Sequence, residues 1–555
     1  MNKTLLTSSP GERLYHFSFV VFWLAISVFV VAKAVTSPNF GGDTTGYLLP
    51  IHNFLNGGGY SRLPGMSFET HVPPGFGILA LLFYWLVQDV ELSGMLVVSI
   101  SFALALLLVY WQTRKVLSPS HALLAVLFVA TIPDYLLASV TNLTDGPFAL
   151  FLLIAFFSLF HSYAGIKTGS HFRAGAVSGF ALGFGTLIRP EMFFVGLIGY
   201  AFWISLLLYE WRKEGPKPSL KPVYTLGLSL ALFVLFVLPY ALFLKSELGF
   251  LTWTGKAGPN IPWILGQGMG YVPPSHPEMS GMDGLFRFLF IDNFSVFFLN
   301  VAKNFWTLFN KSILELSPPL KLFLFLTFLI ALFHWDSLVQ TVRRCQTCLI
   351  CALALLACVF PIIPSSMLFV YDRLIMPYLV VLAVFLAWGS IELLKLASTL
   401  LGKALFHGPL IALAAAMLFT GHFRAYHEVA TVPNAHFGLR AAGSWLFDNV
   451  PGIAPPQVMV AGRGSPVYIR LLGGRPAKNA QFVAHIDGKV SLESLSSYVK
   501  ESGAKYLVLG AVHIDRFPKL QPLWSTPAIA SSYGLEITHV DAKDRFRIFA
   551  LPAIR

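Results

Sequence analysis

The chain has 555 residues, of which 55% are hydrophobic and only 12% are charged, and its mean hydropathy is +0.68. Soluble globular proteins carry about 25% charged residues, so this composition excludes an ordinary soluble protein and indicates that a bilayer surrounds most of the chain. The net charge of +12 does not indicate nucleic-acid binding. The basic residues stand in short clusters between apolar runs, as they do in the cytoplasmic loops of membrane proteins.

Apolar runs of about 17–25 residues, the length that crosses a bilayer, predict an all-α, polytopic membrane bundle of about eleven transmembrane helices. The first run is long enough to span, so we interpret it as an uncleaved helix rather than a signal peptide. With the N-terminus inside, nearly all basic short loops fall on one side, which supports the count and the orientation. The predicted spans are 15–36, 92–111, 121–140, 146–165, 173–189, 191–209, 222–244, 319–335, 347–366, 375–394 and 404–421.

The apolar run 74–88 does not fit this alternation, because counting it as a span would move Arg114 and Lys115 to the outside. We therefore predict a helix that begins after Pro74 and lies at the outer interface. Trp85 would then sit at the level of the lipid headgroups, where tryptophan is enriched.

The outside of the membrane is predicted to receive three large pieces, namely the loops 37–91 and 245–318 and the tail 422–555. The predicted domains are therefore a transmembrane domain over 1–421 and an extracytoplasmic α/β domain over 422–555. Hydrophobic patterning in the tail predicts strands at 457–461, 505–509 and 545–550 and helices at 441–449 and 492–503.

The four cysteines all lie within 345–358 and are too few for a disulfide scaffold. Three of them share one face of a predicted helix, but no histidine is near, so packing explains them better than a metal site. No metal ligand is assigned and no cofactor is certain, although a divalent metal is compatible with the acidic residues described next.

Two acids are predicted to reach the outer face from different loops. Asp43 follows the first span within a glycine-rich segment, where it could act as a general base or a metal ligand. Asp145 follows the third span and lies on the same predicted side of the membrane. Each also has a structural interpretation, because Asp43 could cap a helix that starts near Thr44, and Asp145 could cap one before Pro147. The convergence of two acids on one face favours a site.

Basic groups join the acids at that face. Arg189 interrupts two apolar spans, and Arg373 precedes the tenth span. A guanidinium near a membrane is costly without a partner, and phosphate is a good partner because it accepts two parallel hydrogen bonds. The alternatives are an ion pair of Arg189 with Glu191 or of Arg373 with Asp372, or a contact with a lipid headgroup.

The first outer loop adds Glu69 and His71 just before two prolines that stiffen the chain and start a helix. His71 could contact an anionic group, although a single histidine is more often structural. Walker loops, nucleophile elbows and the zinc motif His-Glu-x-x-His are all absent from the sequence.

The order of these motifs resembles that of the GT-C glycosyltransferases, in particular the group of protein O-mannosyltransferases and the aminoarabinose transferase of lipid A. Segment 42–47 (Gly-Asp-Thr-Thr-Gly-Tyr) is similar to the family's acidic first-loop motif, although Thr44 stands where a second acid is common. Segment 71–75 (His-Val-Pro-Pro-Gly) resembles a His-Pro-Pro stretch with Val72 inserted. The other similar segments are 142–147 (Asn-Leu-Thr-Asp-Gly-Pro), 186–191 (Thr-Leu-Ile-Arg-Pro-Glu) and 371–377 (Tyr-Asp-Arg-Leu-Ile-Met-Pro).

The resemblance covers about residues 15–420 in layout and implies inverting transfer of a sugar from a polyprenyl-phosphate carrier to a lipid, glycan or protein acceptor at the outer face. It implies that Asp43 is the catalytic base and that Asp145 orients the acceptor or the sugar. The donor phosphate would be held by Arg189 or Arg373. The remaining predicted substrate-binding and phosphate-binding residues are Tyr47, Glu69, His71 and Glu191.

A transporter or flippase of a lipid-linked sugar is the alternative function. It predicts functional polar groups near the bilayer midplane, whereas the polar residues of this chain gather at one interface. A non-catalytic scaffold that displays the tail would leave this gathering without a reason. The expected location is a prokaryotic cytoplasmic membrane, with the N-terminus inside and the C-terminal domain outside. The sugar, the acceptor and the length of the lipid carrier are not specified by the sequence.

Overall fold

The structure is a computed structural model that describes residues 10–36, 44–61, 68–164, 172–214, 220–255, 377–381, 437–453, 457–461, 504–511 and 517–551, together with single residues between these ranges. Asp43 and Arg373 lie outside the described residues, as do the four cysteines and the predicted spans 319–335, 347–366 and 404–421.

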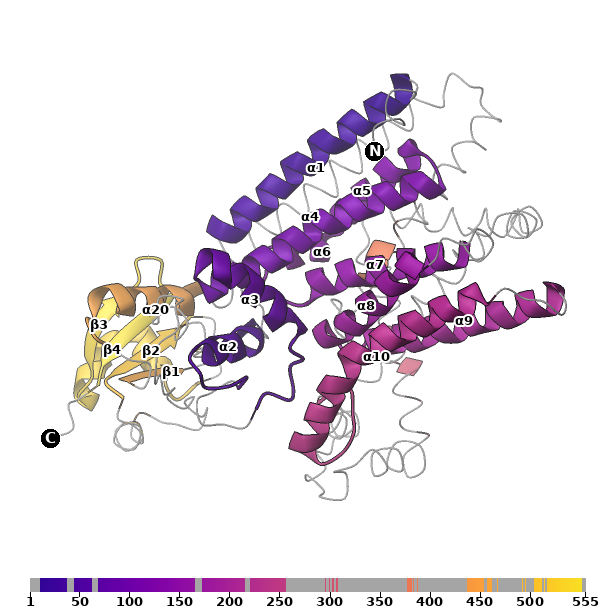
Figure 1. Cartoon of the computed structure of the whole chain (residues 1–555). Coiled ribbons are helices and arrows are strands. Elements are labelled where there is room, and N and C mark those ends of the chain that lie inside the picture. Colours follow the sequence, from indigo (N-terminus) through magenta and orange to yellow (C-terminus); the bar gives the residue numbers. More distant parts are fainter. Residues whose placement is uncertain are drawn as a thin grey trace.

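Four of the described helices are long and apolar enough to cross a membrane: α1 (Pro10–Thr36), α4 (Val90–Val116), α7 (Asp145–Ala164) and α10 (Lys221–Leu248). The shorter apolar helices α8 (Phe172–Ile188) and α9 (Met192–Glu214) complete this part of the bundle (Figure 1). All six coincide with predicted spans, so the helical membrane fold is confirmed. The count of about eleven spans stays a prediction.

The third predicted span, 121–140, is not one helix. It consists of α5 (Pro119–Ala130) and the short α6 (Pro133–Ala138). The break lies at Ile132, which is extended with φ −74° and ψ 109°. A residue that precedes proline avoids the helical region, because the proline ring collides with its backbone. The prediction of one continuous helix is therefore wrong, and Pro133 is the reason for the break.

Two short helices lie between α1 and α4 in the chain, α2 (Thr44–Leu55) and α3 (Gly75–Val87). As predicted, α3 begins directly after Pro74, and it packs against α2 and α4. Trp85 and Leu86 on its other face are 82% and 78% exposed. Such apolar exposure suits contact with lipid, in keeping with the predicted place of α3 at the outer interface.

Helices α8 and α10 are packed through small residues. A Cβ added to Gly179 would overlap the carbonyl oxygen of Ser229, and Gly175 and Gly183 approach α10 in the same way one turn to either side. Small residues allow helices in a membrane to come this close. The hydroxyl of Ser229 is also hydrogen-bonded to those of Ser178 (2.8 Å) and Tyr200 (2.9 Å). This packing fixes the position of α8.

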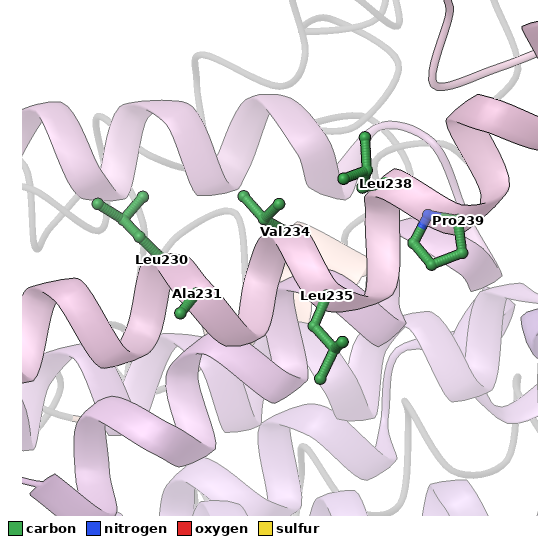
Figure 2. Close-up of a pocket in the computed structure, with 6 residues that line it drawn as sticks. All are labelled: Leu230, Ala231, Val234, Leu235, Leu238 and Pro239. Carbon is green, nitrogen blue, oxygen red and sulfur yellow. The ribbon is translucent and has the colours of Figure 1, made fainter.

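The opposite face of α10 carries a shallow apolar groove of about 500 Å³. Figure 2 shows its lining, which comes from α10 alone. Pro239 at one end removes a helical hydrogen bond, and α10 changes direction towards its C-terminal end (Figure 1). The lining residues are Leu230, Ala231, Val234, Leu235, Leu238 and Pro239.

The C-terminal domain contains a four-stranded sheet with the order β1-β2-β4-β3. The strands are β1 (Val458–Ala461), β2 (Tyr506–Gly510), β3 (Glu536–Val540) and β4 (Phe546–Ala550). β1 and β2 are parallel, whereas β4 is antiparallel to both β2 and β3. Helix α20 (Phe437–Asn449) packs on β2 and β4, and the short α23 (Gln521–Ser525) and the 3-10 helix η7 (Pro527–Tyr533) connect β2 to β3.

The three predicted strands and the first predicted helix of the tail are thus confirmed. Of the predicted helix 492–503, only Leu492 and Leu495 are described; both are helical and buried in the core of the domain. β3 is not predicted by the hydrophobic pattern, because four of its five residues are exposed. Its place is set by pairing with β4 rather than by burial.

Candidate functional site

The centre of the candidate site is formed by two helix ends that lie side by side. α7 begins at Asp145 and α8 ends at Ile188, and the two helices pack against each other in opposite directions (Figure 1). Arg189 continues the last turn of α8, since its N–H donates to the carbonyl of Gly185 at 2.8 Å. An acid in a first turn and a cation after a last turn are both stabilised by the helix dipole, so the helix hairpin brings two complementary charges together.

Arg189 is buried between two carboxylates. Its Nη1 donates to Oδ1 of Asp145 at 2.6 Å, and its Nη2 donates to Oε1 of Glu191 at 3.1 Å. Its guanidinium carbon also lies 5.1 Å from the centre of the Phe148 ring. The side chains of Arg189 and Asp145 are only 10% and 4% exposed. A buried charge of this kind requires a paired, hydrogen-bonded partner.

Glu191 and Asp145 both bind the guanidinium of Arg189 and compensate the burial of its charge. Arg189 therefore stays charged in the site. The ion pair with Glu191 that we considered from the sequence is present, and Asp145 is a second partner. Two carboxylates and one guanidinium leave the group with a net charge of −1 when all three are ionised.

Two tyrosines, Tyr47 and Tyr378, lie close to Arg189. Tyr47 of α2 is buried and accepts a hydrogen bond from the hydroxyl of Thr144 at 3.3 Å. The Tyr378 ring meets that of Phe148 edge-on, with 6.2 Å between the ring centres. The segment 377–381 therefore reaches the site from more than 180 residues away in the chain.

The start of α2 is attached to the turn that precedes Asp145. The hydroxyl of Thr44 donates to the carbonyl of Asn142 at 2.8 Å, and both residues are buried. Thr44 directly follows Asp43, whose own placement is outside the described residues. The first-loop and third-loop motifs thus meet through their neighbouring residues, as the predicted convergence requires.

Glu69 and His71 belong to a loop that ends against α8. Oε1 of Glu69 accepts the N–H groups of His71 (2.7 Å) and Val72 (2.9 Å), so Glu69 holds the loop in shape. A Cβ added to Gly75 would lie 2.5 Å from the carbonyl carbon of Leu187, two residues before Arg189. Only glycine allows α3 to begin this close to the end of α8.

Of the eight predicted site residues, the structure brings Asp145, Arg189, Glu191 and Tyr47 together, and it places Glu69 and His71 in the adjoining loop. Arg373 and Asp43 are outside the described residues. The sequence reasoning did not select Tyr378, Thr144, Asn142 or Phe148. Their only signal was position, because each lies inside or next to a motif segment.

Within the described ranges, no group of three or more His, Cys, Asp or Glu side chains is arranged to hold a metal ion. Asp145 and Glu191 are both bonded to Arg189. A metal at this site would have to draw ligands from Asp43 or other residues beyond those ranges, and it stays a possibility raised by the sequence alone.

Comparison with known proteins gives one family match and several structural matches. Residues 71–241 match the family described as dolichyl-phosphate-mannose-protein mannosyltransferase. This segment contains His71, Asp145, Arg189 and Glu191, that is, most of the described site. No curated protein sequence matches the chain.

Two solved structures share the fold over most of the chain. ArnT from Cupriavidus metallidurans, bound to undecaprenyl phosphate, is 13% identical with a TM-score of 0.57, and the match covers 96% of this chain and 98% of ArnT. The archaeal oligosaccharyltransferase AglB from Archaeoglobus fulgidus, in complex with an inhibitory peptide and a dolichol-phosphate, is 15% identical with a TM-score of 0.55. That match covers 90% of this chain and 70% of AglB.

Three of the motif segments that carry the resemblance, 71–75, 142–147 and 186–191, lie completely within the family match, and the match to ArnT covers 96% of this chain. The resemblance of this chain to the GT-C glycosyltransferases, and to the protein O-mannosyltransferase and ArnT group among them, is thereby confirmed.

Proposed function

We propose that the protein transfers a sugar from a polyprenyl-phosphate carrier to a lipid, glycan or protein acceptor at the outer face of the membrane, with inversion at the sugar carbon. The observation that carries this proposal is the buried ion pair between Arg189 and Asp145 at the end of two membrane helices, inside the segment that matches the mannosyltransferase family. The polyprenyl phosphates bound by ArnT and AglB support this class of donor.

The proposed reaction needs a base, a way to orient the reactants and a stable leaving group. The acceptor O–H or N–H would give its proton to the carboxylate of Asp43, and the freed electron pair would attack the anomeric carbon. The bond from that carbon to the phosphate oxygen breaks at the same time. Its electrons stay on the phosphate, which leaves as the polyprenyl phosphate. Attack opposite to the leaving group inverts the anomeric centre.

The described contacts sharpen the roles of the two arginines. Arg189 already binds two carboxylates, so we propose that its main role is to hold Asp145 in one orientation while Asp145 orients the acceptor or the sugar. A guanidinium has five N–H donors, and the two bonds to Asp145 and Glu191 use one donor on each of Nη1 and Nη2. Arg189 therefore keeps donors for a phosphate, but Arg373 is the better candidate to stabilise the charge of the leaving group.

The other predicted site residues are given roles from their positions around Arg189. Tyr47 borders the cation and would contact the sugar or the phosphate. Glu69 shapes the loop that presents His71, and His71 would contact the phosphate side of the donor. Glu191 shares the guanidinium of Arg189 with Asp145, which would fix the guanidinium between the two carboxylates.

The location of these groups supports an enzyme more than a transporter or flippase. The buried charged side chains of the described bundle, Glu69, Glu91, Asp145 and Arg189, lie at the starts or ends of helices or in the adjoining loop, not in the middle of a span. A transporter is expected to hold such groups near the bilayer midplane. The orientation that we predict from the basic loops puts this end outside, together with the C-terminal domain.

The test is sugar transfer by the purified protein in detergent with lipid. A panel of radiolabelled polyprenyl-phosphate sugars is offered with candidate acceptors, and loss of label from the carrier is followed. We expect one donor to be consumed, and Asp43→Ala to abolish its consumption while the protein stays folded. Asp448→Asn is the matched control, because Asp448 is an exposed acid of α20, and it should retain full activity.

Normal turnover by Asp43→Ala would contradict the role of Asp43 as the base. Movement of an intact donor across liposomes, without transfer to any acceptor, would contradict the enzyme and favour the flippase.

A further inference from the structure

We propose that Arg440, in the C-terminal domain, is a positioning residue for the candidate site in the membrane domain. Arg440 fixes the position of the first turn of α4. That turn contacts the segment that leads into Asp145 and fixes its position. The inference rests on the proposed transfer activity and adds a function for the C-terminal domain, which neither the motifs nor the comparisons assign.

The contact is an ion pair between residues 349 positions apart in the chain. Nε of Arg440 donates to Oε1 of Glu91 at 2.7 Å. Arg440 belongs to α20, whereas Glu91 is the second residue of α4. The C-terminal domain lies beside this end of α4 in Figure 1. The pair therefore joins the two predicted domains directly.

The pair is buried on the membrane-domain side. The side chain of Glu91 is 1% exposed and that of Arg440 is 18% exposed. An ionised carboxylate that is buried to this extent is costly unless a cation and hydrogen bonds compensate it. Arg440 supplies such a cation from another domain, so the position of α20 and the position of the first α4 turn depend on each other.

Two further contacts lead from Glu91 to the site. The side-chain amide of Asn142 donates to the backbone carbonyl of Glu91 at 3.2 Å. The carbonyl of Asn142 accepts the hydroxyl of Thr44 at 2.8 Å, which attaches the residue after Asp43. Asn142 is fully buried and stands three residues before Asp145. Asn142 thus connects α4 through its side-chain amide and α2 through its backbone carbonyl, directly before the start of α7.

Gly94 shows that this connection is closely packed. A Cβ at Gly94, one turn along α4 from Glu91, would overlap the side-chain oxygen of Asn142. Any shift of the first α4 turn would consequently be passed to Asn142 by direct contact as well as by the hydrogen bond. The predicted result is a displacement of Asp145, and a displacement of about 1 Å at a reacting group can cost on the order of 100-fold in rate.

The experiment compares Arg440→Ala, Arg440→Lys, Glu91→Gln and the double variant Arg440→Ala/Glu91→Gln in the full-length protein. Transfer kinetics and amide hydrogen exchange are measured for each. Asp544→Asn is the matched control, because Asp544 forms an ion pair with Arg547 within the C-terminal domain and its side chain is 59% exposed.

We expect Arg440→Ala and Glu91→Gln each to lower kcat by about 10-fold to 100-fold with little change in the KM for the donor. The double variant should lose no more than the worse single variant, because both changes break one connection. Arg440→Lys should recover part of kcat by restoring the charge, and Asp544→Asn should match the wild type. Amides of 91–94 and 142–145 should exchange faster in Arg440→Ala, whereas those of the packed α8 and α10 segments should not.

Wild-type kcat and wild-type exchange at 142–145 in Arg440→Ala would overturn the inference. Fully additive losses in the double variant would also overturn it. If the wild-type protein transfers no sugar, the proposed function fails, but the exchange measurements still test the connection from Arg440 to the turn before Asp145. If Arg440→Ala does not fold, Arg440→Lys and Glu91→Gln carry the same test with smaller structural changes.

Discussion

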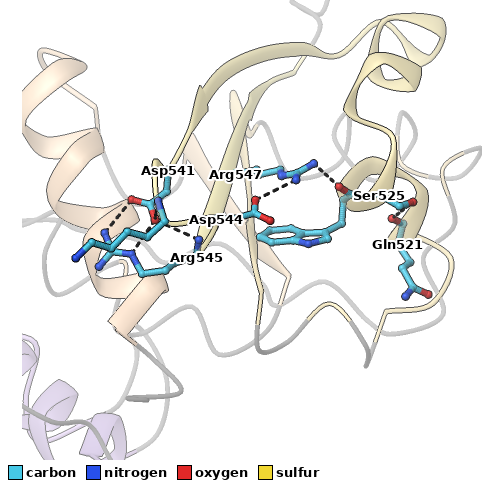
Figure 3. Close-up of polar contacts among 8 residues, drawn as sticks. Gln521, Ser525, Asp541, Asp544, Arg545 and Arg547 are labelled. Atoms are coloured by element: carbon cyan, nitrogen blue, oxygen red, sulfur yellow. Dashed lines mark hydrogen bonds and ion pairs between the residues drawn. The ribbon is translucent and has the colours of Figure 1, made fainter. Parts of the chain in front are cut away.

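Two ion pairs between arginine and aspartate, in different parts of the molecule, have different consequences. Asp145 and Arg189 join two membrane helices and are almost completely buried. Asp541 and Arg545 lie in the turn between β3 and β4 of the C-terminal domain (Figure 3), and Arg545 is 30% exposed. The chemistry of the two pairs is the same, so the difference comes from sequence separation and from access to water.

The pair in the turn is a local structural device. The two oxygens of Asp541 accept Nε (2.7 Å) and Nη2 (2.8 Å) of Arg545, and one of them also accepts the N–H groups of Lys543 and Arg545. These bonds shape a turn in which Asp544 adopts a left-handed conformation with φ 50°. An aspartate that binds the backbone two and four residues later is typical of turns, so no function needs to be assigned to it.

The pair at the membrane face has no such local purpose, because 44 residues separate its members. It buries charge where a bilayer makes charge expensive, and it does so next to two tyrosines and the first-loop motif. An ion pair therefore indicates a site when it is buried, when its two members are far apart in the chain, and when it lies where several motifs meet.

The largest effect is expected from Arg189→Ala. It would leave the buried Asp145 and the half-buried Glu191 without their cation, and removal of one partner of a buried ion pair costs about 3–5 kcal/mol. Thermal unfolding in detergent should show a large loss of stability, and sugar transfer should fall below detection. Arg545→Ala, which breaks the pair in the turn, should cost about 1 kcal/mol or less after solvent screening and preserve transfer. Equal losses of stability in Arg189→Ala and Arg545→Ala would show that burial and chain separation do not distinguish the two pairs.

A smaller effect is expected from Gly179→Ala, which tests whether the position of α8 depends on packing. The added methyl group would collide with the carbonyl oxygen of Ser229, and overpacking of this kind costs about 1–3 kcal/mol. Because α8 carries Arg189, transfer should fall together with stability. Gly227→Ala on α10 is the matched control, since a Cβ there meets nothing within 4 Å. If both alanine variants unfold at the wild-type temperature, the close contact of the two helices is not as described.

The pair in the turn should respond to acid. Hydrogen bonds from Arg545 lower the pKa of Asp541 to about 2, below the value of about 3.9 expected in the unfolded chain. The stabilisation is therefore present above about pH 4 and is lost as the pH falls towards 2, with an amplitude of ~1 kcal/mol after allowance for solvent screening. Hydrogen exchange of β3 and β4 at pH 5 and pH 2.5 would measure this loss, and Asp541→Asn should remove the pH dependence.

The smallest effect is expected from Tyr47→Phe. It removes the hydroxyl that accepts from Thr144 at 3.3 Å, and the loss of one such hydrogen bond costs about 0.5–1.5 kcal/mol. If Tyr47 also contacts the donor, the KM for the donor should rise while the melting temperature changes little. An unchanged KM would restrict Tyr47 to a structural role in the site.

Much of the fold could be predicted because hydrophobicity acts locally. Each of the helices α1, α4, α7, α8, α9 and α10 was visible as an apolar run, since a membrane helix must satisfy its backbone hydrogen bonds internally and cover them with apolar side chains. The break at Ile132 was not predicted, although Pro133 is its cause. β3 was not predicted because an exposed edge strand carries no alternating pattern of buried residues.

The candidate site was predicted as a set of acids and arginines that share one side of the membrane, because the alternation of spans fixes the side on which each loop lies. The alternation of spans does not show which acid binds which arginine. The sequence suggested Glu191 as the partner of Arg189 from their closeness in the chain, but Asp145 makes the shorter bond, at 2.6 Å. It also gave no indication of Tyr378 or of the contact between Arg440 and Glu91.

The sequence by itself determined that this is a membrane protein, where most of its long apolar helices lie in the chain, and which loops carry charge, since all of these follow from the free energy of placing each residue in water or in lipid. Only the tertiary structure decided which charges meet. The antiparallel packing of α7 and α8 places Asp145 beside Arg189, and the docking of α20 places Arg440 beside Glu91. Such pairs depend on the close approach of helices and on the cost of burying an unpaired charge, and neither quantity can be obtained from the order of residues along the chain.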